Sequence, residues 1–446
     1  MATAYLTRNT GGTGTSGKKF TISFWMKCAD TTNSITMFSA SSNSLSSPFT
    51  LIRRNSTGAL RFTDYTNNTT ERASKITNRL LRDPSAWYHI VIAVDTDQST
   101  ASERNRIYIN GVEETSFATD INYSSGATTS MGQNNEMVIG RYEPYNSNYF
   151  DGIISHFHYA DGQQYAPTVF GETDSTSGIW KPKTSPSVSY GTNGFFLDFA
   201  DSSALGDDES GNTNDFTVNG TITQTEDSPS NNFATLNPLL DVNAVGTYSN
   251  GNLGFTGTGS TNFGGCSMPV SKGKWYVEVK TTVSGSYYPM LGVIDAQSTL
   301  RRNSVYFTNT DVDTNNPSGF GVQANGDIYH NADNTYGNLG TTYTTGDIIG
   351  LALDMDSATK TLGFYKNGTL QTTINLDDPP SGSYIFCASI YATYSSAKTD
   401  WNFGNGYFGT TAVASSNSDS AGLGLFEYSV PSGYYSLCTK NIKNYG

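Results

Sequence analysis

Cysteine, histidine and basic side chains are scarce in this sequence of 446 residues. Its four cysteines lie far apart and match no metal-ligand spacing: Cys28, Cys266, Cys387 and Cys438. We therefore expect reduced cysteines in hydrophobic cores rather than a disulfide framework.

The balance of charge excludes a further class of function. Lys and Arg total 26 against 39 Asp and Glu, which gives a formal net charge of −13. Because binding to nucleic acid needs a basic face, the composition argues against a nucleic-acid partner. The negative charge is instead typical of a protein kept soluble by self-repulsion.

Long apolar runs are also missing. No stretch approaches the length of a membrane span, and residues 1–8 show no basic region followed by an apolar one. We therefore expect a soluble protein that is made in a cytoplasm, does not insert into membranes and reaches the outside of a cell only through assembly or lysis.

What the sequence does contain is a strong strand pattern. In the segment 346–370 apolar residues occupy every second position, at Ile349, Leu351, Leu353 and Met355. After a polar turn the alternation resumes and stops at Asn367-Gly368, a dipeptide that favours a tight type I′ hairpin turn. A similar meander occupies 87–112 and ends in Asn110-Gly111.

These patterns predict an all-β chain with two antiparallel β-sandwich (jelly-roll) domains in tandem. No window is typical of an amphipathic helix, and 45 glycines fit the many turns of such domains. We place the first domain at 1–170 and the second at 241–446. Between them, residues 171–240 form an ordered connector that contributes a strand, since prolines at 182 and 186 cannot continue a sheet.

The first domain resembles a known family. The segments 20–27, 87–95, 107–111 and 150–157 are similar to the concanavalin A-like lectin and glucanase superfamily, in its laminin-G and pentraxin-like branch. The resemblance implies a lectin-type sandwich.

The second domain resembles the SPRY (B30.2) family. A Lys-Trp-Tyr-x-Glu strand at 274–278, the segment 346–350, the Phe-Tyr-Lys-Asn-Gly turn at 364–368 and Asn-Phe-Gly at 402–404 follow in the family's order. This resemblance implies a bent two-sheet sandwich that binds proteins or ligands through loops at one edge and does not catalyse a reaction.

The tandem as a whole resembles structural proteins of marine tailed bacteriophages. The connecting segments 178–183, 190–195 and 232–238 and the closing segments 431–434 and 437–439 carry this likeness. It implies a virion protein of the tail-fibre, appendage or capsid-decoration type. The implied partners are other virion proteins, further copies of the chain (a trimer is common in fibres) and a host-surface glycan or protein receptor.

Two motifs suggest ligand chemistry and are better explained without it. Residues 12–19 match G-x-G-x-x-G and nearly match a phosphate loop, but Lys19 takes the place of the Mg²⁺-binding Ser or Thr and a strand follows, so we expect a flexible turn. His156 and His158 are spaced to share one face of a strand. Zinc needs further ligands and the other histidines are His89 and His330, so we expect solvent-facing or groove-lining imidazoles and no metal.

Calcium is the one cofactor that the sequence leaves open. Hard oxygen ligands gather at Asp207, Asp208, Glu209, Asn212 and Asn214, without the spacing of an EF-hand. An Asx-rich solvated turn explains this loop. A calcium site there or near Asp151 is the alternative, and no other cofactor is expected.

Catalytic signatures are missing as well. A glycosidase needs two carboxylates at a set separation, whereas Glu278 is alone on its strand and Glu113-Glu114 follow a turn. No serine nucleophile signature is present. We therefore expect no catalytic residues and a protein that is not an enzyme. Alternatives are a virion-associated polysaccharide depolymerase and a bacterial surface adhesin, against which the missing export signal weighs.

Three tyrosines are candidate contacts for a ligand or a partner. Tyr142, Tyr145 and Tyr149 lie in the polar loop 141–149. Their rings could stack on sugar faces or fill an interface between subunits, and the sequence leaves both interpretations open.

Overall fold

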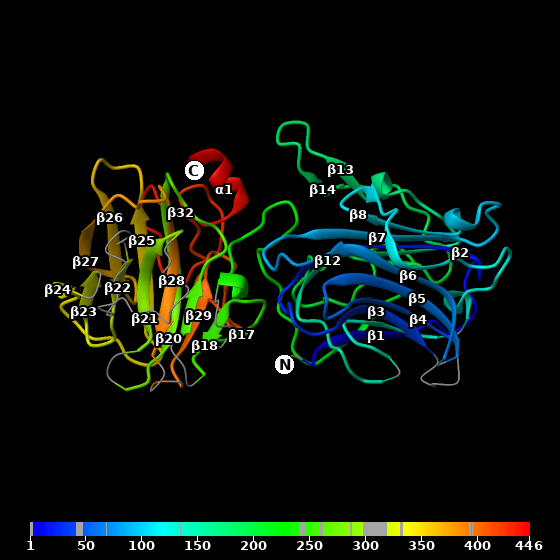
Figure 1. Cartoon of the computed structure of the whole chain (residues 1–446), viewed down its shortest axis with the longest axis horizontal. Coiled ribbons are helices and arrows are strands. Elements are labelled where there is room, and N and C mark those ends of the chain that lie inside the picture. The colour runs from blue at the N-terminus through cyan, green and yellow to red at the C-terminus, as the bar shows by residue number, and fades with distance from the viewer. Residues whose placement is uncertain are drawn as a thin grey trace. The chain divides into compact units, whose positions relative to one another are not determined.

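The chain forms two compact units that divide between residues 224 and 225 (Figure 1). The computed structural model describes residues 3–41, 48–67, 69–133, 135–143, 145–240, 246–258, 262–285, 288–297, 319–330, 333–391, 394 and 396–446. Each unit is described by itself below.

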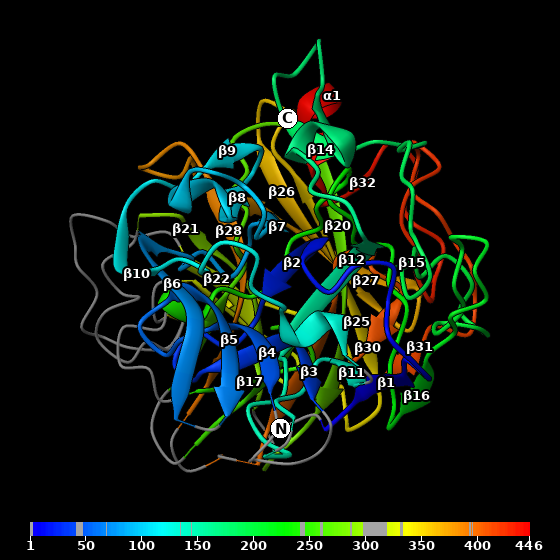
Figure 2. The ribbon, with the colours of Figure 1, turned by 90° about the vertical axis from the view of Figure 1, so that its right-hand side faces the viewer.

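The larger sheet of unit 1 has eight strands in its described residues. Their order is β10 (Phe117–Ile121), β6 (Thr70–Leu80), β5 (Ala59–Asn67), β4 (Phe49–Arg54), β3 (Ile35–Ser41), β11 (Glu136–Ile139), β1 (Tyr5–Asn9) and β16 (Thr217–Asn219). Strands β3 to β6 lie side by side in Figure 2, and all pairs are antiparallel.

The second sheet of unit 1 has six strands. Their order is β15 (Phe195–Leu197), β12 (Gly152–Asp161), β2 (Lys19–Cys28), β7 (Tyr88–Asp95), β8 (Asn105–Ile109) and β9 (Val112–Glu113). Short 3-10 turns lie at Ala101–Glu103 (η1), Ser130–Gly132 (η2) and Pro167–Val169 (η3). The hairpin of β13 (Gly171–Thr173) and β14 (Trp180–Pro182) forms a small sheet of its own.

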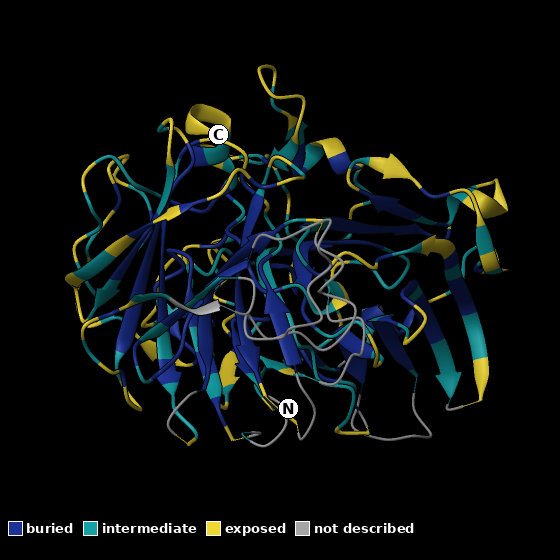
Figure 3. Cartoon of the chain, turned by 60° about the vertical axis from the view of Figure 1, so that its left-hand side comes forward, coloured by how far each residue is buried: buried dark blue, intermediate teal, exposed yellow. Residues whose placement is uncertain are grey.

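The two sheets of unit 1 pack face to face. The ring of Phe157 on β12 stacks on Phe24 of β2 at 5.0 Å and contacts Phe38 of the larger sheet at 5.8 Å. Alternate residues along each strand enter this core because side chains on a strand point to opposite faces. The result is a β-sandwich whose strands are buried and whose exposed residues lie at turns and edges (Figure 3).

Part of the segment assigned to a connector is built into unit 1. Strand β15 pairs with β12 and strand β16 pairs with β1, so 171–240 contributes a strand to each sheet of this sandwich. Residues 225–240, which include the 3-10 turn η4 (Pro238–Leu240), lie in unit 2.

Unit 2 is a second sandwich. One sheet has the order β17 (Thr247–Ser249), β18 (Gly254–Thr256), β29 (Lys398–Asn402), β20 (Lys274–Thr282), β25 (Ile348–Asp354), β26 (Lys360–Lys366) and β27 (Thr369–Leu376), with β32 (Tyr435–Ser436) beside β20. The other has β19 (Asn262–Gly265), β28 (Tyr384–Ile390), β21 (Met290–Asp295), β22 (Gly319–Val322), β23 (Asp327–His330) and β24 (Asp333–Asn338). The hairpin of β30 (Tyr407–Phe408) and β31 (Thr411–Ala412) and the helix α1 (Thr439–Tyr445) complete the described elements.

The core of unit 2 follows the predicted alternation. Ile349, Leu351 and Leu353 are fully buried between the sheets. Their neighbour Ala352 faces the other way, yet it is buried too, because Tyr276 and Phe426 cover that face. The alternation therefore identified the inner face correctly but could not show that residues far along the chain cover the outer one.

Both predicted hairpin turns are present. Asn110 and Gly111 have φ values of 51° and 80°, and Asn367 and Gly368 have values of 47° and 80°. These positive values are what a type I′ turn requires. Both three-stranded meanders predicted from the sequence are confirmed.

The cysteines lie in the interior. All four are buried free thiols, as expected of core residues. Among the described residues, no helix combines the length and the apolar character that a membrane crossing requires.

Candidate functional site

The outer face of the larger sheet of unit 1 carries a group of aromatic and charged side chains. On β4, Ile52 points into the core, so Phe49 and Arg53 point outward. On β5, Phe62 points into the core, so Arg61 and Tyr65 point outward. The register pairs Phe49 with Tyr65 and Arg53 with Arg61, which places all four side chains on the same face.

Two of the predicted tyrosines join this face. The rings of Phe49 and Tyr65 stack at 4.4 Å, Tyr142 lies 6.2 Å from Phe49, and Tyr145 lies 4.9 Å from Tyr142. We call these four residues the tyrosine surface. Phe49 is buried beneath the others, whereas Tyr145 is 42% exposed. The surface therefore has an apolar base and accessible ring faces and hydroxyl groups.

The loop that carries Tyr142 is held in place by the sheet under it. The Ser39 hydroxyl donates to the Arg141 carbonyl at 2.8 Å and accepts from the Glu143 backbone N–H at 3.1 Å. The backbone N–H of Tyr142 donates to the Ser147 carbonyl at 2.9 Å. Ser39 thus fixes the backbone on both sides of Tyr142, so the ring position is set before any ligand arrives.

Tyr149 does not belong to this surface. Its ring packs on Tyr5 of β1 at 6.1 Å, and the Arg141 guanidinium lies 4.0 Å from the centre of the Tyr5 ring on β1. The structure therefore brings together Tyr142 and Tyr145 and places Tyr149 elsewhere. Phe49 and Tyr65 were missed by sequence reasoning, although each ends an alternating strand pattern and could have been found as an outward-facing aromatic.

Charged groups border the tyrosine surface. The Arg61 guanidinium contacts a Glu71 carboxylate oxygen and the Tyr65 hydroxyl, each at 2.5 Å. Burial raises the pKa of Tyr142 to about 12 and also raises the pKa of Tyr65. Both phenols therefore stay protonated at neutral pH and can donate as well as accept hydrogen bonds.

The glycine-rich turn at 12–19 is an internal anchor instead of a phosphate site. The buried Asp161 carboxylate accepts the backbone N–H groups of Thr15 at 2.6 Å, Ser16 at 3.2 Å and Asn193 at 3.1 Å. The donors that a phosphate would need are therefore already occupied. The expectation of a turn is confirmed, but that turn is tied to β12 rather than free.

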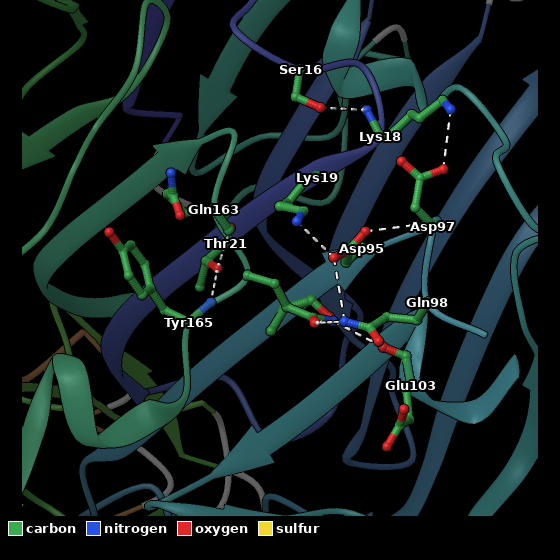
Figure 4. Close-up of polar contacts among 12 residues, drawn as sticks. Ser16, Lys18, Lys19, Thr21, Asp95, Asp97, Gln98, Glu103, Gln163 and Tyr165 are labelled. Carbon is green, nitrogen blue, oxygen red and sulfur yellow. Dashed lines mark hydrogen bonds and ion pairs between the residues drawn. The ribbon is translucent and has the colours of Figure 1, made fainter. Parts of the chain in front are cut away.

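The lysines of this turn are also occupied (Figure 4). Lys18 forms an ion pair with Asp97 at 3.1 Å, and Lys19 forms one with Asp95 at 2.8 Å. Asp95 additionally accepts from the side-chain amide of Gln98 at 3.3 Å. The network joins the glycine-rich turn to the end of β7.

The histidines do not form a metal site. A bulge in β12 between Ser155 and His158 gives His156 a φ of 48°, so the expectation that His156 and His158 share one face is wrong. His158 is buried, stacked on Phe196 at 4.0 Å, so it is not the solvent-facing imidazole expected. In the part of the chain that the structure describes, no three His, Cys, Asp or Glu side chains converge to hold a metal ion.

The acidic loop at 207–215 uses its oxygens internally. Asp208 accepts the backbone N–H groups of Phe196 at 2.8 Å and of Ser210 and Asn214 at 2.9 Å each. Asp215 accepts the N–H of Asp208 at 2.9 Å. These bonds close an Asx-type turn, and they occupy the carboxylates that a calcium ion would use.

Glu278 of unit 2 is a structural carboxylate. It is fully buried and accepts the backbone N–H groups of Glu427 and Tyr428 at 2.9 Å each. The Tyr276 hydroxyl and the Asn402 amide reach it at 3.3 and 3.4 Å. Glu278 thereby fastens the segment around Phe426 onto the sheet, while Glu113 and Glu114 pair with arginines 106 and 79.

Unit 1 also has a polar pocket of about 480 Å³ beside β1 and β16. Its lining includes the Arg8 guanidinium and the carboxylates of Glu136 and Asp215. Arg8 already contacts the Asn214 side chain and donates to the Asn193 carbonyl at 3.2 Å. The pocket lacks the aromatic rings that distinguish the tyrosine surface.

A comparison with protein families finds one match to this chain. The model described as the concanavalin A-like lectin/glucanases superfamily matches residues 2–164. The match lies within the first sandwich. Together with the sheets described above, it confirms the predicted fold class of antiparallel sandwiches with a concanavalin A-like jelly roll.

Solved structures with related folds fall into the two families recognised in the sequence. Domains LG4-5 of the mouse laminin alpha1 chain are 10% identical, with 90% of this chain and 85% of that chain covered and a TM-score of 0.29. The SPRY domain of human HERC1 is 22% identical, with coverages of 35% and 91% and a TM-score of 0.27. A SAP-like pentraxin from Limulus polyphemus is 16% identical, with coverages of 36% and 71% and a TM-score of 0.27.

These scores are too low to support an argument about function. No curated protein sequence matches the chain.

Proposed function

We propose that this chain is a non-catalytic carbohydrate-binding protein and that its tyrosine surface contacts the sugar. The observation that carries the proposal is the grouping of Phe49, Tyr65, Tyr142 and Tyr145 on the outer face of the larger sheet of unit 1. Exposed rings can cover the apolar face of a sugar, and hydroxyl and guanidinium groups at their edge can bond its polar rim.

The carboxylates support a binding role over hydrolysis. Glycoside hydrolysis needs two carboxyl groups flanking the bond. At the tyrosine surface Glu71 is ion-paired with Arg61, and Glu143 contacts Arg141. Neither is arranged as a free acid opposite a second carboxylate, so binding without catalysis fits this surface better.

We further propose that the chain works as a virion structural protein of a tailed bacteriophage, as a tail fibre, an appendage or a capsid decoration that attaches to the host surface. The tandem of laminin-G-like and SPRY-like segments with their connecting motifs supports this proposal. Such a protein is expected to assemble with other virion proteins and with copies of itself. Several copies would add weak single-site contacts into firm attachment.

The binding proposal is tested by substitution of the tyrosines. Purified full-length protein is applied to an array of neutral and acidic host-surface glycans. Tyr142→Ala and Tyr145→Ala are each expected to weaken binding roughly tenfold, which corresponds to about 1.4 kcal/mol. Tyr149→Ala is the matched control, because it removes the same ring from the same loop outside the tyrosine surface.

Equal losses in all three variants, or no saccharide binding by the wild-type protein, would contradict the proposal. Removal of divalent cations with a chelator is expected to leave binding unchanged, since the chain's own N–H groups occupy the acidic loop.

The virion proposal is tested by electron microscopy of purified virions labelled with an antibody to this chain. Label at a tail or vertex appendage supports attachment to the host, and label over the capsid supports a decoration protein. Unlabelled virions would overturn the virion proposal and would leave the binding proposal to the glycan measurements.

A further inference from the structure

Two arginines face each other at the edge of the tyrosine surface. Arg53 of β4 and Arg61 of β5 are direct partners in the antiparallel register. Directly opposed residues have Cβ atoms only about 5 Å apart, and like charges at such positions destabilise a sheet. A sequence selected for stability alone would place an opposite charge at one of the two positions.

The charges at this position do not cancel. Glu71 pairs with Arg61 at 2.5 Å. Among the residues that the structure describes, Arg53 donates through Nε to the Asn55 side-chain oxygen at 3.1 Å, and its two terminal nitrogens contact no acceptor and no carboxylate. Two guanidinium groups and one carboxylate leave a local positive charge in a chain whose net charge is −13.

The surroundings strengthen this charge. Arg53 is half-buried, and burial together with the neighbouring Arg61 lowers the pKa of Arg53. A charge that is partly withdrawn from water and repelled by its neighbour gains more from an added anion than an exposed arginine does. The terminal nitrogens of a guanidinium match the paired oxygens of a carboxylate or a sulfate group.

The arginine pair and the aromatic rings lie on one continuous face. Phe49 and Arg53 occupy alternate positions of β4 and are separated by about 13 Å along the strand. Arg61, Thr63 and Tyr65 follow the same face of β5, and the Nε of Arg61 donates to the Thr63 hydroxyl at 2.8 Å. An extended chain of sugars on this face would meet rings at one end and guanidinium groups at the other.

We propose that the tyrosine surface selects an acidic glycan, with a carboxylate or sulfate group bound by Arg53 and Arg61 and a neighbouring sugar ring placed on Tyr142 and Tyr145. This inference rests on the proposed carbohydrate binding and adds the class of sugar. The net charge of the chain repels polyanions in general, so binding of an acidic glycan needs a local site of this kind.

The test compares three polymers with the full-length protein: polygalacturonate for carboxylates, dextran sulfate for sulfates and unmodified dextran as the neutral reference. Titration calorimetry is expected to show that one or both acidic polymers bind at least about tenfold more tightly than dextran. The preference between the two acidic polymers identifies the anion.

Substitutions at Arg53 provide the decisive comparison. Arg53→Gln is expected to remove about tenfold of the affinity for the acidic polymer, and Arg53→Lys is expected to restore part of it, because the charge returns without the fork of donors. Arg82→Gln, which removes the same charge from an exposed position of unit 1, is the control. Arg53→Gln should fold with an unchanged or slightly higher Tm because it relieves the repulsion with Arg61.

The possible failures can be told apart. Equal binding of dextran and the acidic polymers, or equal losses in Arg53→Gln and Arg82→Gln, would overturn this inference and leave the proposed function standing. No binding to these polymers or to any saccharide of the glycan array would overturn both.

Discussion

The indole N–H of Trp180 donates a hydrogen bond of 2.9 Å to Nδ1 of His89. Since an indole nitrogen can only donate, Nδ1 of His89 must be the acceptor, and the proton of the neutral ring is on Nε2. That nitrogen lies 2.8 Å from the Ser23 hydroxyl and donates to it. Residues from three distant segments thus fix one tautomer of one buried ring.

His89 is predicted to remain neutral in the folded protein. Burial lowers its pKa from 6.5 to about 3, so the unfolded chain takes up a proton more readily than the folded one. The stabilisation is complete above pH 6.5 and is lost progressively as the pH falls toward 3. Ring-nitrogen NMR should show the Nε2–H tautomer without titration between about pH 4 and pH 8. A His89 signal that titrates near its ordinary pKa would contradict the prediction.

Glu278 predicts the opposite pH dependence for unit 2. Burial raises the pKa of this carboxyl from 4.5 to about 7, although hydrogen bonds from Glu427 and Tyr428 oppose the shift. Folding therefore favours the protonated form, and stability should fall by roughly 3 kcal/mol as the pH rises from 4.5 through 7. Denaturant unfolding measured across this range tests the prediction. The Glu278→Gln protein should lose most of that pH dependence, and an unchanged profile would rule out Glu278 as its source.

Asp161 is predicted to be the main support of the glycine-rich turn. Asp161→Ala removes the acceptor of three backbone N–H groups, so unit 1 should lose roughly 2–4 kcal/mol of unfolding free energy. Lys18→Met is the control, because the exposed pair with Asp97 contributes less than about 1 kcal/mol. Calorimetric unfolding of both variants should show a large shift for Asp161→Ala alone. Similar shifts would mean that the turn depends on its lysines.

Gly368 and Gly340 separate backbone strain from steric contact. Both have a positive φ, 80° and 78°, but a Cβ at Gly368 would lie 2.6 Å from the Tyr428 ring, whereas none of the described atoms lies within 4 Å of one at Gly340. Gly340→Ala should cost about 1–2 kcal/mol from the backbone alone. Gly368→Ala should cost more because Tyr428 must move. Equal losses measured by denaturant unfolding would show that Tyr428 moves without cost.

The sequence by itself determined the architecture. Alternation at Ile349, Leu351 and Leu353 and the two Asn-Gly turns identified both meanders, because period two and positive φ are local properties of a strand and its turn. The same local reasoning selected Tyr142 and Tyr145 as candidate contacts and correctly treated residues 12–19 as a turn.

The tertiary structure decided which of these residues meet. Only the pairing of β4 with β5 placed Arg53 against Arg61 and Phe49 against Tyr65, and only the loop fixed by Ser39 brought Tyr142 onto them. Likewise, the bulge at His156 separated two histidines that simple strand periodicity would have aligned. Strand register, bulges and the covering of a sheet's outer face depend on contacts between residues far apart in the chain, and periodicity along one strand carries no information about them.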